Sequence, residues 1–283
     1  MAKNTALRQF LRSIKQDLRG DSTLIETTRA LDKWTIIACQ ALDFGNYDIF
    51  EFALKLLHEA YAALPVAGTA LTEKRLAVIV RFYAVGSLAV RLAAWEALRS
   101  IVLRPAKVHP ADNEYVHSSW IRHGHVEAAR AGLTRDDDTG AYLISASRQL
   151  LAAHPSMRPD LTGAVAPDTN SYRDDDVLLN SLCQFDIFYC LLVVLEGTTS
   201  VRSMYPSSAA FNESRADPAL VAVAGDDTMR AALFPGSSDA DIAAGIYHVV
   251  RLCMQEAMKF GGHWWGPPPS VQDFIAAHGQ NDV

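Results

Sequence analysis

The feature that most constrains the fold is a pair of helical apolar repeats joined by a short turn, in residues 22–63. The turn reads Phe44-Gly45-Asn46-Tyr47-Asp48: Gly45 can take the left-handed conformation that ends a helix, and Asp48 can cap the next one. Residues of one helical stripe recur three or four positions apart on both sides of the turn. They are Leu24, Thr28, Leu31, Thr35, Ala38 and Leu42 before it, and Phe50, Ala53, Leu54, Leu57, Ala60, Tyr61 and Leu64 after it. We therefore expect an αα-hairpin whose two apolar stripes pack together.

This hairpin resembles a unit of the tetratricopeptide repeats, through Gly45-Asn46-Tyr47-Asp48 and the apolar helix after it. A second, weaker resemblance to the same repeat is found in Gly124-His125-x-Glu127-Ala128-Ala129. The chain departs from that family where Phe50 replaces a small residue early in the second helix, and no 34-residue period runs along it. The resemblance implies a shared packing logic, and we assign no family from it.

Helical periodicity continues through most of the chain, and no segment alternates in the manner of a strand. Further helices are expected over residues 4–19, 72–103, 115–132, 138–153, 177–196, 218–224, 226–233, 239–260 and 270–278, the last opened by a Ser270-x-x-Asp273 capping box. A long loop is expected over residues 156–173. The predicted fold is all-α, an irregular array or bundle of about ten helices built from αα-hairpins.

The segment Val177–Glu196 is the most apolar of these helices and has about the length of a membrane span. Asp186 stands near its centre, where a charge costs about 3 kcal/mol on membrane insertion. We expect a central core helix and no transmembrane segment. Because charges in apolar helices need partners, we expect a structural pairing of Asp186 with Arg81 or Arg91, both from the long helix at residues 72–103.

Charge is distributed unevenly between two parts of the chain. Residues 1–107 carry 15 Lys and Arg against 10 Asp and Glu, a net of +5, and residues 108–283 carry 11 against 22, a net of −11. We expect a basic N-terminal hairpin layer and an acidic C-terminal part within one continuous globular unit. The basic part could contact the acidic part of its own chain or of a second copy. The acidic part argues against nucleic acid as a partner.

The four cysteines all fall in apolar helical segments, as Cys39, Cys183, Cys190 and Cys253. No Cys-x-x-Cys spacing occurs, and Cys183 and Cys190 lie about 10 Å apart along one helix, too far for a disulfide. Buried free thiols, together with no signal-peptide pattern at Met1, predict a cytoplasmic protein. The preference for Arg (19) over Lys (7) indicates a GC-rich bacterial source.

A histidine cluster is the first candidate for chemistry. His117, His123 and His125 fall close together, followed by Glu127, and imidazoles two residues apart can chelate one metal where the backbone is extended. Gly124 permits that backbone. The alternative is a set of solvated histidines in a polar connector, and we expect no resident cofactor.

Acidic clusters at Asp136–Asp138 and Asp174–Asp176 each precede an expected helix, where carboxylates cap amides and match the helix dipole. Capping therefore explains them without a cation. The chain has no Gly-x-Ser-x-Gly elbow, no phosphate-binding loop and no dinucleotide glycine pattern. These absences argue against the common hydrolases, nucleoside triphosphatases and dehydrogenases.

Two segments have the composition of partner-binding surfaces. Trp264 and Trp265 precede Pro267-Pro268-Pro269, a rigid arm with roughly 400 Å² of aromatic surface. The N-terminal amphipathic helix also carries basic residues, at Arg8, Arg12 and Lys15. The alternative for both segments is packing on the protein's own core.

The leading functional prediction is a helical protein-interaction or regulatory module without catalytic chemistry, whose partner is another protein or a second copy. One alternative is a metal-dependent enzyme that uses His117, His123, His125 and Glu127. Another is a peripheral membrane protein that binds through its N-terminal helix. Whether the chain is an enzyme stays open, with the non-catalytic module preferred.

Overall fold

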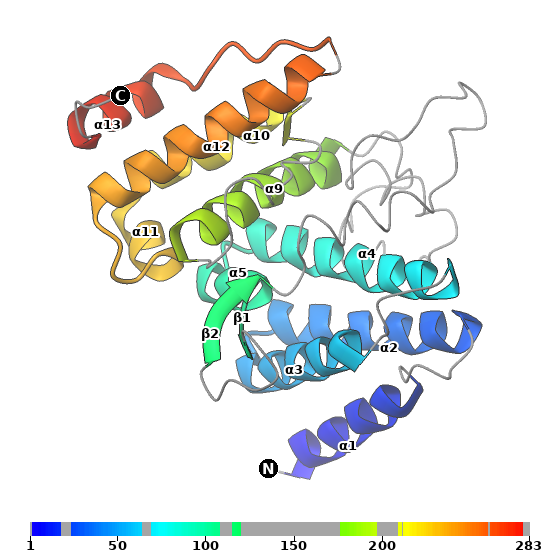
Figure 1. Cartoon of the computed structure of the whole chain (residues 1–283). Coiled ribbons are helices and arrows are strands. Elements are labelled where there is room, and N and C mark those ends of the chain that lie inside the picture. The colour runs from blue at the N-terminus through cyan, green and yellow to red at the C-terminus, as the bar shows by residue number, and fades with distance from the viewer. Residues whose placement is uncertain are drawn as a thin grey trace.

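The computed structural model describes residues 2–17, 24–63, 69–107, 115–119, 176–196, 209–210, 212–259 and 261–279 (Figure 1). These residues form ten α-helices, which confirms the expected all-α array. The helices stack roughly in chain order, from α1 at one end of the molecule to α13 at the other. Their bounds are α1 Ala2–Asp17, α2 Leu24–Asp43, α3 Tyr47–Ala63, α4 Thr69–Arg91, α5 Trp95–Val102, α9 Asp176–Glu196, α10 Glu213–Gly225, α11 Asp227–Leu233, α12 Asp239–Lys259 and α13 Pro269–His278.

Two short strands accompany the helices. β1 (Leu103–Lys107) pairs antiparallel with β2 (Tyr115–Ser119), with Pro105 opposite His117. The prediction of helix from Tyr115 was therefore wrong for residues 115–119. The backbone hydrogen bonds of a partner strand, which periodicity within one segment does not report, decide the conformation here.

The α2–α3 hairpin forms as predicted. Gly45 has φ +64° and ends α2, while the amides of Gly45 and Asn46 donate to the carbonyls of Leu42 (3.1 Å) and Ala41 (2.7 Å). The cap of α3 differs from the prediction, because the Oδ1 atom of Asn46 accepts from the Ile49 amide at 3.4 Å. Asp48 lies inside the first turn of α3 instead.

One long helix predicted at residues 72–103 is two helices in the structure. α4 ends at Arg91, Ala93 takes a left-handed conformation with φ +50°, and α5 begins at Trp95. The amides of Ala93 and Ala94 donate to the carbonyls of Val90 (3.1 Å) and Ala89 (2.9 Å). The amides of Gly45 and Asn46 make the same pair of hydrogen bonds at the end of α2. An alanine carries no sequence signal for such an end.

The helix α9 lies in the middle of the stack and packs on α4, α5, α10 and α12. Its side chains from Leu182 to Val193 are buried except that of Gln184. Of the described helices it alone, over Leu179–Glu196, has the length and apolar composition of a membrane span, and 67% of that stretch is buried inside the protein. Burial between neighbouring helices accounts for the composition.

The α4–α9 contact is closed by aromatic rings. The centroid of Phe185 lies 5.2 Å from that of Phe82 and 5.4 Å from that of Tyr83, both in edge-on arrangements. Gly86 makes this contact possible, since a Cβ atom there would lie 2.3 Å from Phe185 Cε2. Gly86 does not end α4, and its lack of a side chain admits the neighbouring ring.

Of the four C-terminal helices, α10 and α13 differ from expectation at their first residues, whereas α12 begins at Asp239 as expected. α10 begins at Glu213, five residues before the expected start, with Pro218 inside it. α13 begins at Pro269, a residue type that fits the first helical position, so Ser270 lies within the helix and the capping-box prediction was wrong. α11 follows expectation, because Asp226 caps it by accepting from the Met229 amide at 2.9 Å.

Candidate functional site

A groove of about 570 Å³ lies between α12, α13 and the segment that joins them. We call this segment, residues 261–268, the arm. Most of the groove wall is apolar or aromatic. Its lining residues are Tyr247, Val250, Arg251 and Met254 of α12, Trp265, Gly266 and Pro267 of the arm, and Gln272, Ile275 and Ala276 of α13.

The course of the arm begins where α12 ends. Gly261 has φ +74°, and the amides of Gly261 and Gly262 donate to the carbonyls of Met258 (3.2 Å) and Ala257 (2.9 Å). The two tryptophans then separate: Trp264 is 6% exposed and belongs to the core, whereas Trp265 is 89% exposed beside the groove. The sequence prediction treated them as one aromatic surface, and only Trp265 offers its ring to a partner.

A carboxylate from a distant part of the chain fixes the outer end of the arm. Glu213, the first residue of α10, accepts hydrogen bonds at Oε1 from the amides of Trp265 (2.8 Å) and Gly266 (3.0 Å). Gly266 has φ +105°, a conformation open to glycine. Gln272 donates from Nε2 to the Pro267 carbonyl at 2.7 Å, which ties the arm to the first turn of α13. The wall of the groove is therefore held in place from two sides.

A second carboxylate follows Glu213 one helical turn later. Asp217 is half-buried, and burial, with a further contribution from the charge of Glu213, raises the pKa of its carboxyl to about 6. Its Oδ1 atom and the Nε1 atom of Trp264 make no hydrogen bond to the described residues. The support of the arm thus contains a titratable group near neutral pH.

Among the residues that the structure describes, Arg251 is the one charged residue that lines the groove. It is exposed, and its guanidinium carbon lies 5.7 Å from the centroid of the Tyr247 ring. It forms no ion pair with the described residues, whereas Arg81, Arg99 and Arg230 each contact a carboxylate. A planar cation with its donors available therefore stands in an apolar wall.

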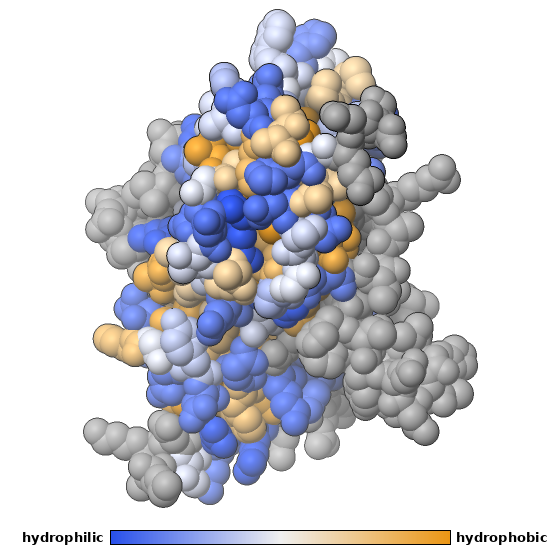
Figure 2. All heavy atoms as spheres, turned by 90° about the vertical axis from the view of Figure 1, so that its left-hand side faces the viewer, coloured by the Kyte–Doolittle hydropathy of each residue, from blue (hydrophilic) through white to orange (hydrophobic). Residues whose placement is uncertain are grey.

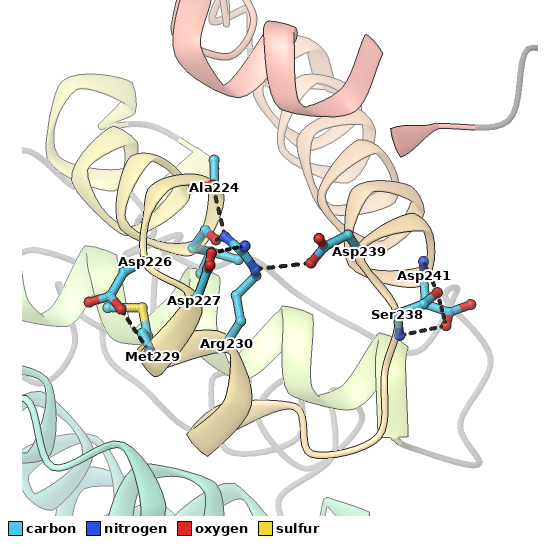
Figure 3. A network of polar contacts seen from close by, with 9 residues as sticks. Ala224, Asp226, Asp227, Met229, Arg230, Ser238, Asp239 and Asp241 are labelled. Atoms are coloured by element: carbon cyan, nitrogen blue, oxygen red, sulfur yellow. Dashed lines mark hydrogen bonds and ion pairs between the residues drawn. The ribbon is translucent and has the colours of Figure 1, made fainter. Parts of the chain in front are cut away.

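The positions of α11, α12 and α13 depend on a polar network around the buried Arg230 (Figure 3). Nη1 donates to the carbonyls of Val223 and Ala224, each at 2.9 Å, while Nη2 contacts Asp227 and Nε lies 3.2 Å from Asp239 Oδ1. The guanidinium carbon also lies 5.0 Å from the centroid of the α13 residue Phe274. The charge is fully engaged, so we assign this network a structural role.

The four residues of the predicted metal site are not brought together by the described part of the chain. His117 lies on β2, and His123, His125 and Glu127 fall outside the described residues. Within the described residues, no three His, Cys, Asp or Glu side chains are placed to hold a metal ion. The metal site and the enzyme that would use it stay predictions.

The basic residues of α1 contact the protein's own α3. The guanidinium carbons of Arg8 and Arg12 lie 5.4 and 5.6 Å from the centroid of Phe52, and Leu11 and Ile14 are buried. The third predicted residue, Lys15, belongs to α1, but its side chain is outside the description. The apolar face of this helix is used within the molecule, while membrane contact through it stays a prediction.

The three predicted buried charges, Arg81, Asp186 and Arg91, differ in how deeply they are buried. Arg81 of α4 is 4% exposed and pairs with Asp32 of α2 at 2.7 Å. Asp186 is fully buried on α9, and Arg91, at the end of α4, is half-buried. The partner of Arg81 thus comes from the hairpin, 49 residues earlier in the chain, and not from the core helix.

The four cysteines are buried free thiols, as predicted. Burial, with a further contribution from Asp43, raises the pKa of the Cys39 thiol to about 12. Burial likewise raises the pKa of Cys190 and Cys253. Because the thiolate is the reactive form, none of these three thiols suits nucleophilic chemistry.

Sequence reasoning missed Tyr247, Arg251 and Met254, although their spacing places them on one side of α12. They border the buried stripe that includes Ile246, Val250 and Cys253, so periodicity alone includes them in the core face.

Comparison of the chain with protein-family models, curated proteins and solved structures finds no match in any of the three.

Proposed function

We propose that this chain is a helical protein-interaction module that binds a peptide segment of a partner protein in the groove between α12, α13 and the arm. The observation that carries the proposal is an apolar groove bordered by Trp265, whose ring is 89% exposed on a backbone fixed by Glu213. Large aromatic residues at such sites supply most of the energy of many protein interfaces.

The rigidity of the arm supports binding in this groove. Because the amides of Trp265 and Gly266 are already bonded to Glu213, the backbone of the arm loses less conformational freedom on association than that of a loose loop, so more of the contact energy remains as affinity. On the face in Figure 2, apolar side chains lie in separate patches between hydrophilic ones, the pattern of an ordinary protein surface.

The test is selection of a phage-displayed library of random linear peptides against the full chain, followed by fluorescence titration with synthetic copies of the enriched peptides. We expect peptides whose binding falls at least tenfold in Trp265→Ala. The matched control is Phe44→Ala, which removes an aromatic ring that is 80% exposed on the α2–α3 turn. Failure to enrich any peptide that requires Trp265 would contradict the proposal.

A further inference from the structure

We infer that Arg251 binds a carboxylate of the bound segment, so that the partner carries an Asp or Glu side chain next to apolar anchor residues. The inference rests on the proposed function and adds the chemistry of the partner. It makes Arg251 a specificity-determining residue, and Trp265 and its apolar neighbours the general binding surface.

The first step is the state of the Arg251 guanidinium. Its guanidinium carbon lies 5.7 Å from the centroid of the Tyr247 ring, a cation–π distance that leaves the N–H donors unused. It forms no ion pair with the described residues. A guanidinium has parallel N–H donors, the geometry that a carboxylate accepts in a bidentate pair.

The second step is the surroundings of the group. The other described residues that line the groove are uncharged, and Met254, Trp265 and Ile275 give it apolar walls. A segment bound there would displace water from around the guanidinium, and the attraction between opposite charges grows as the local dielectric falls. The volume of about 570 Å³ is within the range of sites that enclose small ligands, so a few side chains can enter together.

The third step is the choice of a carboxylate over a phosphate. Phosphorylated peptides are recognised by clusters of arginines, and nucleic acids by extended basic surfaces. The described lining of the groove has a single cation, in the part of the chain whose net charge is −11. One guanidinium balances one carboxylate, whereas a phosphate would leave excess negative charge in an acidic region.

The experiment uses the peptides enriched on the full wild-type chain. We expect Asp or Glu to be enriched at one position near an aromatic or aliphatic residue. Replacing that acidic residue of the peptide by Asn or Gln should weaken binding to the wild-type chain about tenfold. Arg251→Gln should weaken binding of the original acidic peptide equally. The Arg251→Gln variant should bind the acidic peptide and its Asn or Gln version with the same affinity. Arg251→Lys should recover part of the affinity, because it keeps the charge and loses the bidentate geometry. Arg29→Gln, an exposed arginine of α2, is the control and should change nothing.

A charge exchange gives the sharpest outcome. Arg251→Glu should reject the acidic peptide and bind its Lys-substituted version. Peptides that require Trp265 but show no acidic preference, and no response to Arg251→Gln, would overturn the inference and leave the proposed function standing. Enrichment of basic peptides, or tighter binding of a synthetic copy that carries phosphoserine in place of the acidic residue, would overturn it as well. Absence of any peptide that requires Trp265 would remove both proposals.

Discussion

The α4–α9 contact and the α12–α13 contact join neighbouring helices in opposite ways. In the first, Gly86 removes a side chain so that Phe185 closes the space between the helices. In the second, the arm sets α13 on α12 with a groove of about 570 Å³ open between them. The difference arises from what lies between the helices, which is an aromatic ring in the first contact and an open groove beside the arm in the second. A closed contact supports the fold, whereas an open one leaves surface for a partner.

Gly86→Ala should break the closed contact and give the largest effect on stability. The new Cβ would lie 2.3 Å from Phe185 Cε2, and Phe185 is fully buried. We expect the free energy of unfolding to fall by about 3 kcal/mol, measured by urea denaturation. Gly225→Ala, at a position with nothing within 4 Å of its added Cβ, is the control and should be neutral or slightly stabilising. Equal effects of the two changes would contradict the role given to Gly86.

Glu213→Ala should loosen the open contact. The change removes the acceptor shared by the amides of Trp265 and Gly266, and we expect a loss of about 2 kcal/mol in the free energy of unfolding. Glu96, the acidic residue in the first turn of α5, is exposed and makes a matched control. Glu96→Ala should cost only about 0.5 kcal/mol, from the lost interaction with the helix dipole.

The binding measurement separates the arm from general stability. If Glu213 orders the arm, peptides selected on the wild-type chain should bind more weakly to Glu213→Ala under conditions where the variant is fully folded. Unchanged affinity in a folded Glu213→Ala protein would show that the groove does not depend on this contact.

These contrasts also separate what the sequence predicts from what it does not. The α2–α3 hairpin, the glycine end at Gly45 and the burial of α9 follow from periodicity and glycine geometry within one segment. The groove could not be predicted in this way. Its support joins Glu213 to Trp265 across 52 residues, and the tandem tryptophans give no local signal that one is buried and the other exposed.

Asp217 should make the open region sensitive to pH. Its pKa of about 6 in the folded protein lies above the ~3.9 of an unfolded Asp, so the folded state binds the proton more tightly. This contribution to stability is complete below about pH 4 and is lost as pH rises through 6. Because the side chain is half-exposed and screened by solvent, we expect about 1 kcal/mol. Urea denaturation of wild type and Asp217→Asn at pH 4.5 and 7.5 measures it, and the variant should lose this pH dependence.

The ends of α4 and α12 offer the finest comparison of the two regions. Both use the same pair of backbone hydrogen bonds, but the left-handed residue is Ala93 (φ +50°) after α4 and Gly261 (φ +74°) after α12. A left-handed alanine costs about 1 kcal/mol, so Ala93→Gly should stabilise the protein by roughly 0.5–1 kcal/mol once the freer unfolded chain is counted. Gly261→Ala should destabilise it by a similar amount. Thermal unfolding of both variants tests the pair, and a destabilising Ala93→Gly would show that the alanine methyl group contributes packing that outweighs its backbone strain.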